Sequence, residues 1–152
     1  MFGKPVKEYL ALQKWWLVAL AVMGVLRIAL SLAGLPDSTV KWFSTNVIGW
    51  AASVYYGIAG YQRGFLYKQL LPLVFFHGVL FHTLAVTGIL LTIAGFPNIY
   101  ATPEFSPFPN QWVHIGAHLT LGMVAATLIG WGFASLVMLI TRKVARQPVV
   151  AA

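Results

Sequence analysis

The sequence predicts an all-α polytopic membrane protein, a bundle of four transmembrane helices. Of the 152 residues, 59% are apolar and only 9% are charged. Such a chain cannot surround an ordinary core with a water-facing surface, and its four apolar runs are long enough to cross a bilayer. The connections between the runs are short, so residues 1–152 are expected to form a single four-helix transmembrane domain.

The first two spans are expected at about residues 15–35 and 42–61. Pro36 ends the first because proline cannot continue a helix, and Asp37 or Ser38 can cap the next helix. Each span has at least about 20 residues, which matches the ~30 Å of a bilayer's hydrocarbon.

The third and fourth spans are expected at about residues 70–95 and 111–140. The third begins near Pro72, which is tolerated in a first helical turn, and it ends at Gly95-Phe96-Pro97. Asn110 is the expected N-cap of the fourth span, which ends before Thr141-Arg142-Lys143.

The basic residues predict the orientation of the spans. Most of them belong to the two termini or the middle loop, which four spans place on one side: Lys4, Lys7, Lys14, Arg63, Lys68, Arg142, Lys143 and Arg146. By the positive-inside rule this side is cytoplasmic, so both termini are expected inside a bacterial inner (plasma) membrane. The net charge of +7 then reflects topology and attraction to anionic lipid, and no nucleic-acid partner is expected.

The loop from Phe96 to Gln111 is rich in proline and aromatic residues, with prolines at 97, 103, 107 and 109. Prolines stiffen such a loop, and aromatic rings seat it among lipid head groups. It is expected to be a lid that closes the outer end of the bundle, or else a docking surface for a partner or a flat hydrophobic ligand.

All four histidines fall in the last two spans. His114 and His118 are four residues apart and therefore share one helix face, which makes a two-ligand half-site for a divalent metal ion. Glu104 and Asp37 lie on the same predicted side, and either can complete the site. The alternative is that these histidines bond to backbone, loop or water.

His82 lies near the middle of the third span, where a polar ring is costly unless it finds a partner. It is the candidate axial ligand for haem b or another tetrapyrrole, with Gly78 one turn away leaving room for a flat ring. A hydrogen bond to a hydroxyl such as that of Thr120 is an equal alternative. The chain has no cysteine, which excludes covalent c-type haem attachment and thiolate metal sites.

Counting residues from the outer loop places the histidines at different depths. At ~1.5 Å per residue, His118 lies ~10 Å in and His82 ~20 Å in, so the two are not expected to face each other. His77 is deeper still, and it points roughly 140° away from His82 around their shared helix.

Arg27 lies inside the first span, and no span contains an acidic residue to pair with it. It is a candidate to bind a propionate, a quinone oxygen or a lipid phosphate. Alternatively, it reaches outward and pairs with Asp37.

On the fourth helix, small residues recur at every fourth position, a row that lets another helix approach closely. This small-residue row packs within the chain, or it contacts other membrane subunits or a second copy: Gly122, Ala126, Gly130 and Ala134.

These features predict a non-catalytic integral membrane protein, an accessory or cofactor-holding subunit of a larger membrane assembly. The alternative is a small transporter or channel for a small molecule or metal ion, with His114 and His118 at its mouth. An enzyme is not expected because no nucleophile and base pair or carboxylate dyad is recognisable.

We predict that reporter fusions after residue 152 and in the loop around Glu104 give opposite answers, cytoplasmic and external respectively, because basic residues mark the cytoplasmic side. Labelling of the Glu104 loop from the cytoplasmic side would contradict this topology.

Overall fold

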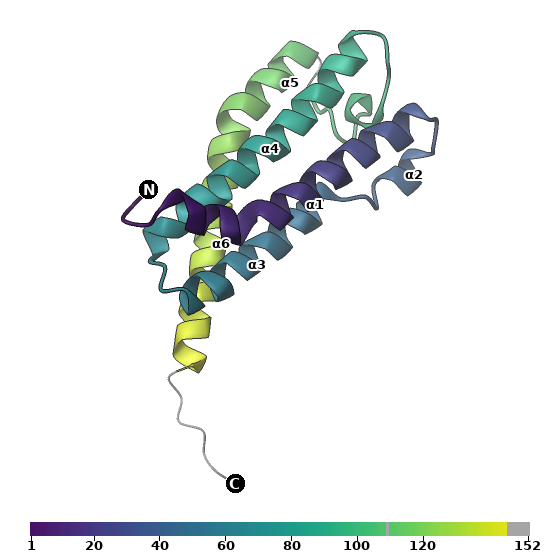
Figure 1. The fold of residues 1–152 in the computed structure, drawn as a ribbon. Coiled ribbons are helices and arrows are strands. Elements are labelled where there is room, and N and C mark those ends of the chain that lie inside the picture. Colours follow the sequence, from purple (N-terminus) through teal and green to yellow (C-terminus); the bar gives the residue numbers. More distant parts are fainter. Residues whose placement is uncertain (109, 146–152) are drawn as a thin grey trace.

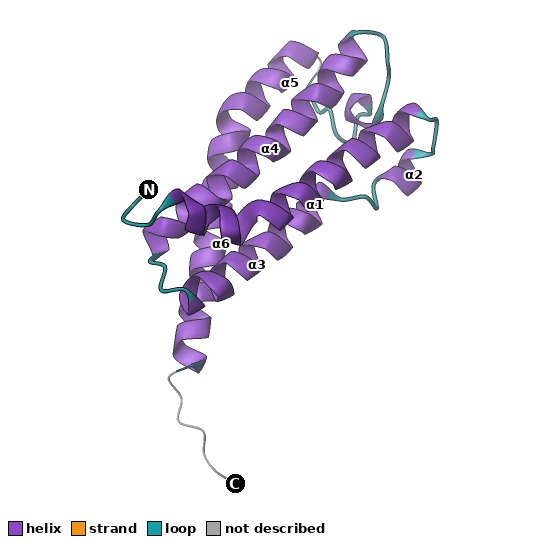
Figure 2. Cartoon of the chain, viewed as in Figure 1, coloured by secondary structure: helices purple, strands orange, loops and turns teal. Residues whose placement is uncertain are grey.

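The computed structural model describes residues 1–108 and 110–145, and this part of the chain forms helices and no strand (Figure 2). Pro109 of the proline-rich loop and Arg146 of the basic C-terminus lie outside the described residues. The all-α prediction is therefore confirmed for the described chain.

Four long helical segments form the body of the molecule, and Figure 1 shows their arrangement. They are α1 (Val6–Leu32), α3 (Thr45–Gln62), α4 (Tyr67–Ile93) and a continuous run of α5 (Gln111–Ala117), η2 (His118–Gly122) and α6 (Met123–Val144). The segment η2 is π-helical. Two short elements lie in the connections, α2 (Asp37–Val40) and the 3-10 helix η1 (Ile99–Ala101).

Three of the segments are long and apolar enough to cross a membrane, namely Val6–Leu32, Tyr67–Ile93 and Gln111–Val144. The helix α3, expected as a span at 42–61, is not among them. It has 18 residues, and its asparagine, serine, tyrosine and glutamine side chains lower its hydropathy.

Several helix ends differ from the expected ones. The helix α4 begins at Tyr67, so Pro72 lies inside it rather than in the first turn, and Gln69 Oε1 accepts the Leu66 N–H at 2.7 Å. The expected caps Asp37 and Ser38 make no capping hydrogen bond for α2 or α3. Asn110 is confirmed as an N-cap, because its side chain accepts the Trp112 N–H at 2.8 Å.

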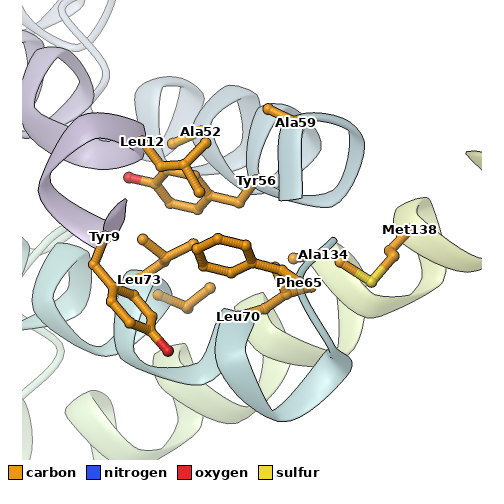
Figure 3. Packing of buried hydrophobic residues seen from close by; sticks show 11 residues of the cluster. Tyr9, Leu12, Ala52, Tyr56, Ala59, Phe65, Leu70, Leu73, Ala134 and Met138 are labelled. Carbon is orange, nitrogen blue, oxygen red and sulfur yellow. The ribbon is translucent and has the colours of Figure 1, made fainter. Parts of the chain in front are cut away.

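The helices α1 and α6 each pack against both α3 and α4. One apolar cluster joins these four helices near the N-terminal end of α1 (Figure 3). There Tyr9, Leu12, Tyr56 and Leu73 are almost fully buried. A second cluster lies toward the other end and includes residues of the loop between α4 and α5.

The small-residue row faces the neighbouring helices of the same chain. A side-chain carbon at Gly130 would come within 2.6 Å of Val74 Cγ1 on α4, and one at Gly57 of α3 would come equally close to the Ala134 carbonyl oxygen. Gly122 faces His82 in the same way, and only Ala126 is exposed. Intramolecular packing, one of the two predicted roles, therefore accounts for most of this row.

The loop between α4 and α5 folds back against the helices. Asn98, Ile99 and Tyr100 are buried, and Asn98 Nδ2 donates to the Gly88 carbonyl oxygen at 2.8 Å. The Ile99 N–H donates to Ser31 Oγ of α1 at 2.8 Å. The predicted lid therefore packs against α1 and α4 through buried contacts.

We predict that Gly130→Leu lowers the free energy of unfolding by about 1–3 kcal/mol, because the added side chain would overlap Val74. Leu128→Ala is the matched control on α6, and it should change stability by no more than ~0.5 kcal/mol because Leu128 is 55% exposed. Thermal unfolding in detergent measures both. Equal effects would mean that Gly130 does not pack against α4.

Candidate functional site

Three of the four histidines form one continuous chain of ring contacts. His82 Nδ1 lies 2.8 Å from His118 Nδ1, and His118 Nε2 lies 3.1 Å from His114 Nε2. His82 and His114 are each 4% exposed, and His118 is half-buried. We call these three residues the histidine chain.

Two helical segments position the histidine chain. His114 on α5 and His118 at the start of η2 are four residues apart, and their ring centroids lie 4.8 Å apart. The predicted shared face of these two residues is confirmed. His82 reaches them from α4, and π-helical turns such as η2 often occur at functional sites.

The expectation that His82 and His118 lie at different depths is wrong. The count assumed that α4 ends and α5 begins at the same level. Instead, the 2.8 Å contact brings His82, eleven residues before the end of α4, level with His118, seven residues after the start of α5, so α5 begins about one turn deeper than the end of α4. The fold-back of the intervening loop lowers the start of α5 and brings the two histidines together.

The contacts within the histidine chain restrict which nitrogen of each ring carries the proton. A neutral imidazole carries one donor and one acceptor, so His118 must donate to one neighbour and accept from the other. The two terminal nitrogens, His82 Nε2 and His114 Nδ1, are buried and have no partner among the described residues. Thr120, the expected alternative partner of His82, instead donates to the Gly116 carbonyl oxygen.

Aromatic rings cover both ends of the histidine chain. Phe81 lies against His82 with ring centroids 5.1 Å apart, and Phe108 lies against His114 at 5.4 Å. These rings shield the terminal imidazoles on one side and restrict their rotation. Neither contact was expected from the residue pattern.

Glu104, predicted to complete a metal site with His114 and His118, is exposed and makes no described ion pair or hydrogen bond with them. The described residues contain no group of three or more histidine, cysteine, aspartate or glutamate side chains arranged to hold a metal ion. His118 Nδ1 faces His82, whereas His118 Nε2 faces His114. The nitrogens of the three rings therefore do not converge on one point where a metal ion could bind.

The space beside His82 is narrow for a tetrapyrrole. A side-chain carbon at Gly78 would lie 3.6 Å from Thr127 Oγ1, so α6 packs close to Gly78. Gly78 also borders a cavity of about 190 Å³, and His77 rather than His82 lines it. Pockets for drug-sized ligands measure ~300–1,000 Å³, so a macrocycle would require these helices to separate.

Arg27 is 4% exposed and lies between two aromatic rings of the loop before α5. Its Cζ atom is 5.4 Å from the Tyr100 ring centroid and 4.7 Å from that of Phe105. Among the described residues it forms no salt bridge with Asp37, so the predicted outward pairing is wrong. Burial raises the pKa of the Tyr100 phenol, while Arg27 opposes this shift, so the ring stays neutral beside the guanidinium.

His77, which sequence reasoning left without a role, faces away from the histidine chain and toward Gly49 of α3. The predicted angular separation of His77 and His82 agrees with this arrangement.

No family model, curated protein or solved structure matches this chain. The functional interpretation therefore depends on the geometry alone.

We predict that His118→Phe destabilises the protein by roughly 1–3 kcal/mol for each of the two buried nitrogens that it leaves unpaired, on His82 and His114. His77→Phe is the matched control, since neither nitrogen of His77 has a hydrogen-bond partner among residues 1–108 and 110–145. Thermal unfolding of both variants in detergent measures the difference. Equal destabilisation would show that the ring contacts of His118 are not stabilising hydrogen bonds.

Proposed function

We propose that this chain is a non-catalytic integral membrane protein that passes protons along its histidine chain. This role places it in the class of small transporters and channels. The observation that carries the proposal is the unbroken contact from His114 through His118 to His82, with an unpartnered buried nitrogen at each end.

We further propose that α3 is a fourth span of a four-helix bundle. Its 18 residues reach ~27 Å, close to the thickness of the hydrocarbon layer. An exposed apolar face supports this placement, with large side chains at helical spacing: Val47, Trp50, Val54 and Ile58.

In the proposed topology, both termini lie on the cytoplasmic side of the bacterial plasma membrane. Lys4 Nζ donates to the Arg63 carbonyl oxygen, so the basic N-terminus and the basic α3–α4 connection lie together. With four spans, Arg142 and Lys143 at the end of α6 join them on the same side. Clustered basic residues favour the cytoplasmic face.

The proton steps balance when the histidine chain starts with His114 Nδ1 unprotonated. A proton that binds at this atom lets His114 pass its Nε2 proton to His118 Nε2. His118 then passes its Nδ1 proton to His82 Nδ1, and His82 releases its Nε2 proton to a water molecule. Every ring is neutral before and after the transfer. Each hydrogen bond then runs in the opposite direction, because His82 now donates to His118 and His118 donates to His114.

Neutral rings suit this position because a fixed charge within the bilayer is costly. Toward the cytoplasmic end, Gln13 Oε1 and the Tyr56 hydroxyl are buried and have no hydrogen-bond partner among the described residues. These two groups offer water molecules polar contacts between the histidine chain and that end.

A second candidate function is a cofactor-holding subunit of a larger membrane assembly, possible partners being other subunits. His82 Nε2 favours it, because this buried nitrogen has no partner among the described residues and could ligate a tetrapyrrole iron if α4 and α6 separated. The absorption spectrum of the purified protein distinguishes the two functions, since bound haem gives a Soret band that His82→Ala should remove.

We predict that proteoliposomes of the full chain conduct protons under a potassium diffusion potential, and that His118→Gln reduces the flux at least tenfold. Glutamine retains a donor and an acceptor but cannot accept a proton at one atom and release another. An entrapped pH dye measures the flux, with Leu128→Ala as the control. Undiminished flux through His118→Gln would exclude the relay.

A further inference from the structure

A separate cavity of about 190 Å³ lies between α3, α4 and α6. Its walls combine polar and aromatic side chains with small residues of α3 and α6. The residues that bear on its chemistry are Asn46, Gly49, Trp50, Ser53, His77 and Phe81. We call it the His77 cavity.

The imidazole of His77 lines this cavity and forms no hydrogen bond with the described residues. The side chain is 6% exposed, and neither ring nitrogen has a hydrogen-bond partner among the described residues. A side-chain carbon at Gly49 would lie 3.6 Å from His77 Nε2, so the missing side chain of this glycine leaves space beside that nitrogen. An unpaired buried imidazole next to open space is a ready hydrogen-bonding group for a ligand.

The cavity borders the surface that the bilayer would cover. Trp50 of α3 is 49% exposed and Ile129 of α6 is 59% exposed, and both line the cavity. A ligand dissolved in the membrane can therefore reach the cavity beside Trp50 and Ile129 without crossing the polar ends of the helices.

The size and lining of the cavity define the ligand class. A cavity of ~150 Å³ holds a benzene molecule, so about 190 Å³ suits one substituted six-membered ring. Among the described residues, no lysine, arginine, aspartate or glutamate lines it, which favours an uncharged ligand. The indole of Trp50 and the ring of Phe81 provide flat walls for stacking.

We propose that the His77 cavity binds the ring of a membrane-soluble quinone or quinol, with His77 as its hydrogen-bonding partner. Neutral histidine can donate to a quinone carbonyl or accept from a quinol hydroxyl. Ser53 Oγ donates its proton to the Gly49 carbonyl oxygen at 2.9 Å, so its lone pairs remain free to accept from a quinol hydroxyl. This site is distinct from the histidine chain and involves binding only.

The test is equilibrium binding of duroquinone, a tetramethyl-substituted single ring, to the full chain in nanodiscs, with empty nanodiscs as the partitioning control. We expect saturable binding of one molecule per chain. His77→Phe keeps a flat ring but removes both nitrogens, and it should weaken binding about tenfold, the usual effect of one hydrogen bond.

Gly49→Ala is a second variant that fills space beside His77 Nε2 at an ordinary contact distance, and it should also weaken binding while leaving thermal stability unchanged. Leu128→Ala, on the exposed face of α6, should bind as the unmodified chain does. Binding that does not exceed partitioning into empty nanodiscs would overturn the proposal. Full affinity in both His77→Phe and Gly49→Ala would overturn it as well.

Discussion

The contact between His82 and His118 depends on how closely α4 approaches the fourth helical segment. A polar ring in an apolar interior must find a partner, and here each imidazole finds another imidazole. Glycine makes this approach possible, because a side-chain carbon at Gly122 would lie 3.0 Å from His82 Cε1. The histidine chain is thus a consequence of backbone packing as much as of the histidines themselves.

The loop between α4 and α5 sets the register of that packing. Asn98 binds the end of α4, and the Ile99 N–H binds Ser31 of α1, so the loop is fixed to two helices. Gly88 leaves space for the Tyr100 ring, where a side chain would overlap it. With Phe105, this ring encloses Arg27 by cation–π contact, which gives a buried cation a partner where no carboxylate is present. The fixed loop then determines the depth at which α5 begins.

The unpaired polar atoms separate into two sites with different chemistry. In the histidine chain, ring nitrogens bond to one another and leave only the ends open, which suits proton transfer. His77 stands alone beside a cavity with aromatic walls, which suits recognition of an uncharged ring. The two histidines of α4 serve different sites because five residues turn a helix by roughly 140°.

Local sequence patterns were enough to predict the all-helical architecture, three helices long and apolar enough to cross a membrane, the Asn110 cap and the shared face of His114 and His118. These features follow from local periodicity, apolar length and capping chemistry, which depend on neighbouring residues alone. The contact of His82 with His118, the aromatic rings around Arg27 and the cavity beside His77 arise from the packing of helices that are distant in the sequence. Residue counting could not give the contact between His82 and His118 because the fold-back of the loop shifts α5 by about one turn relative to α4. Contacts between helices depend on such register, which side chains distant in the sequence fix together.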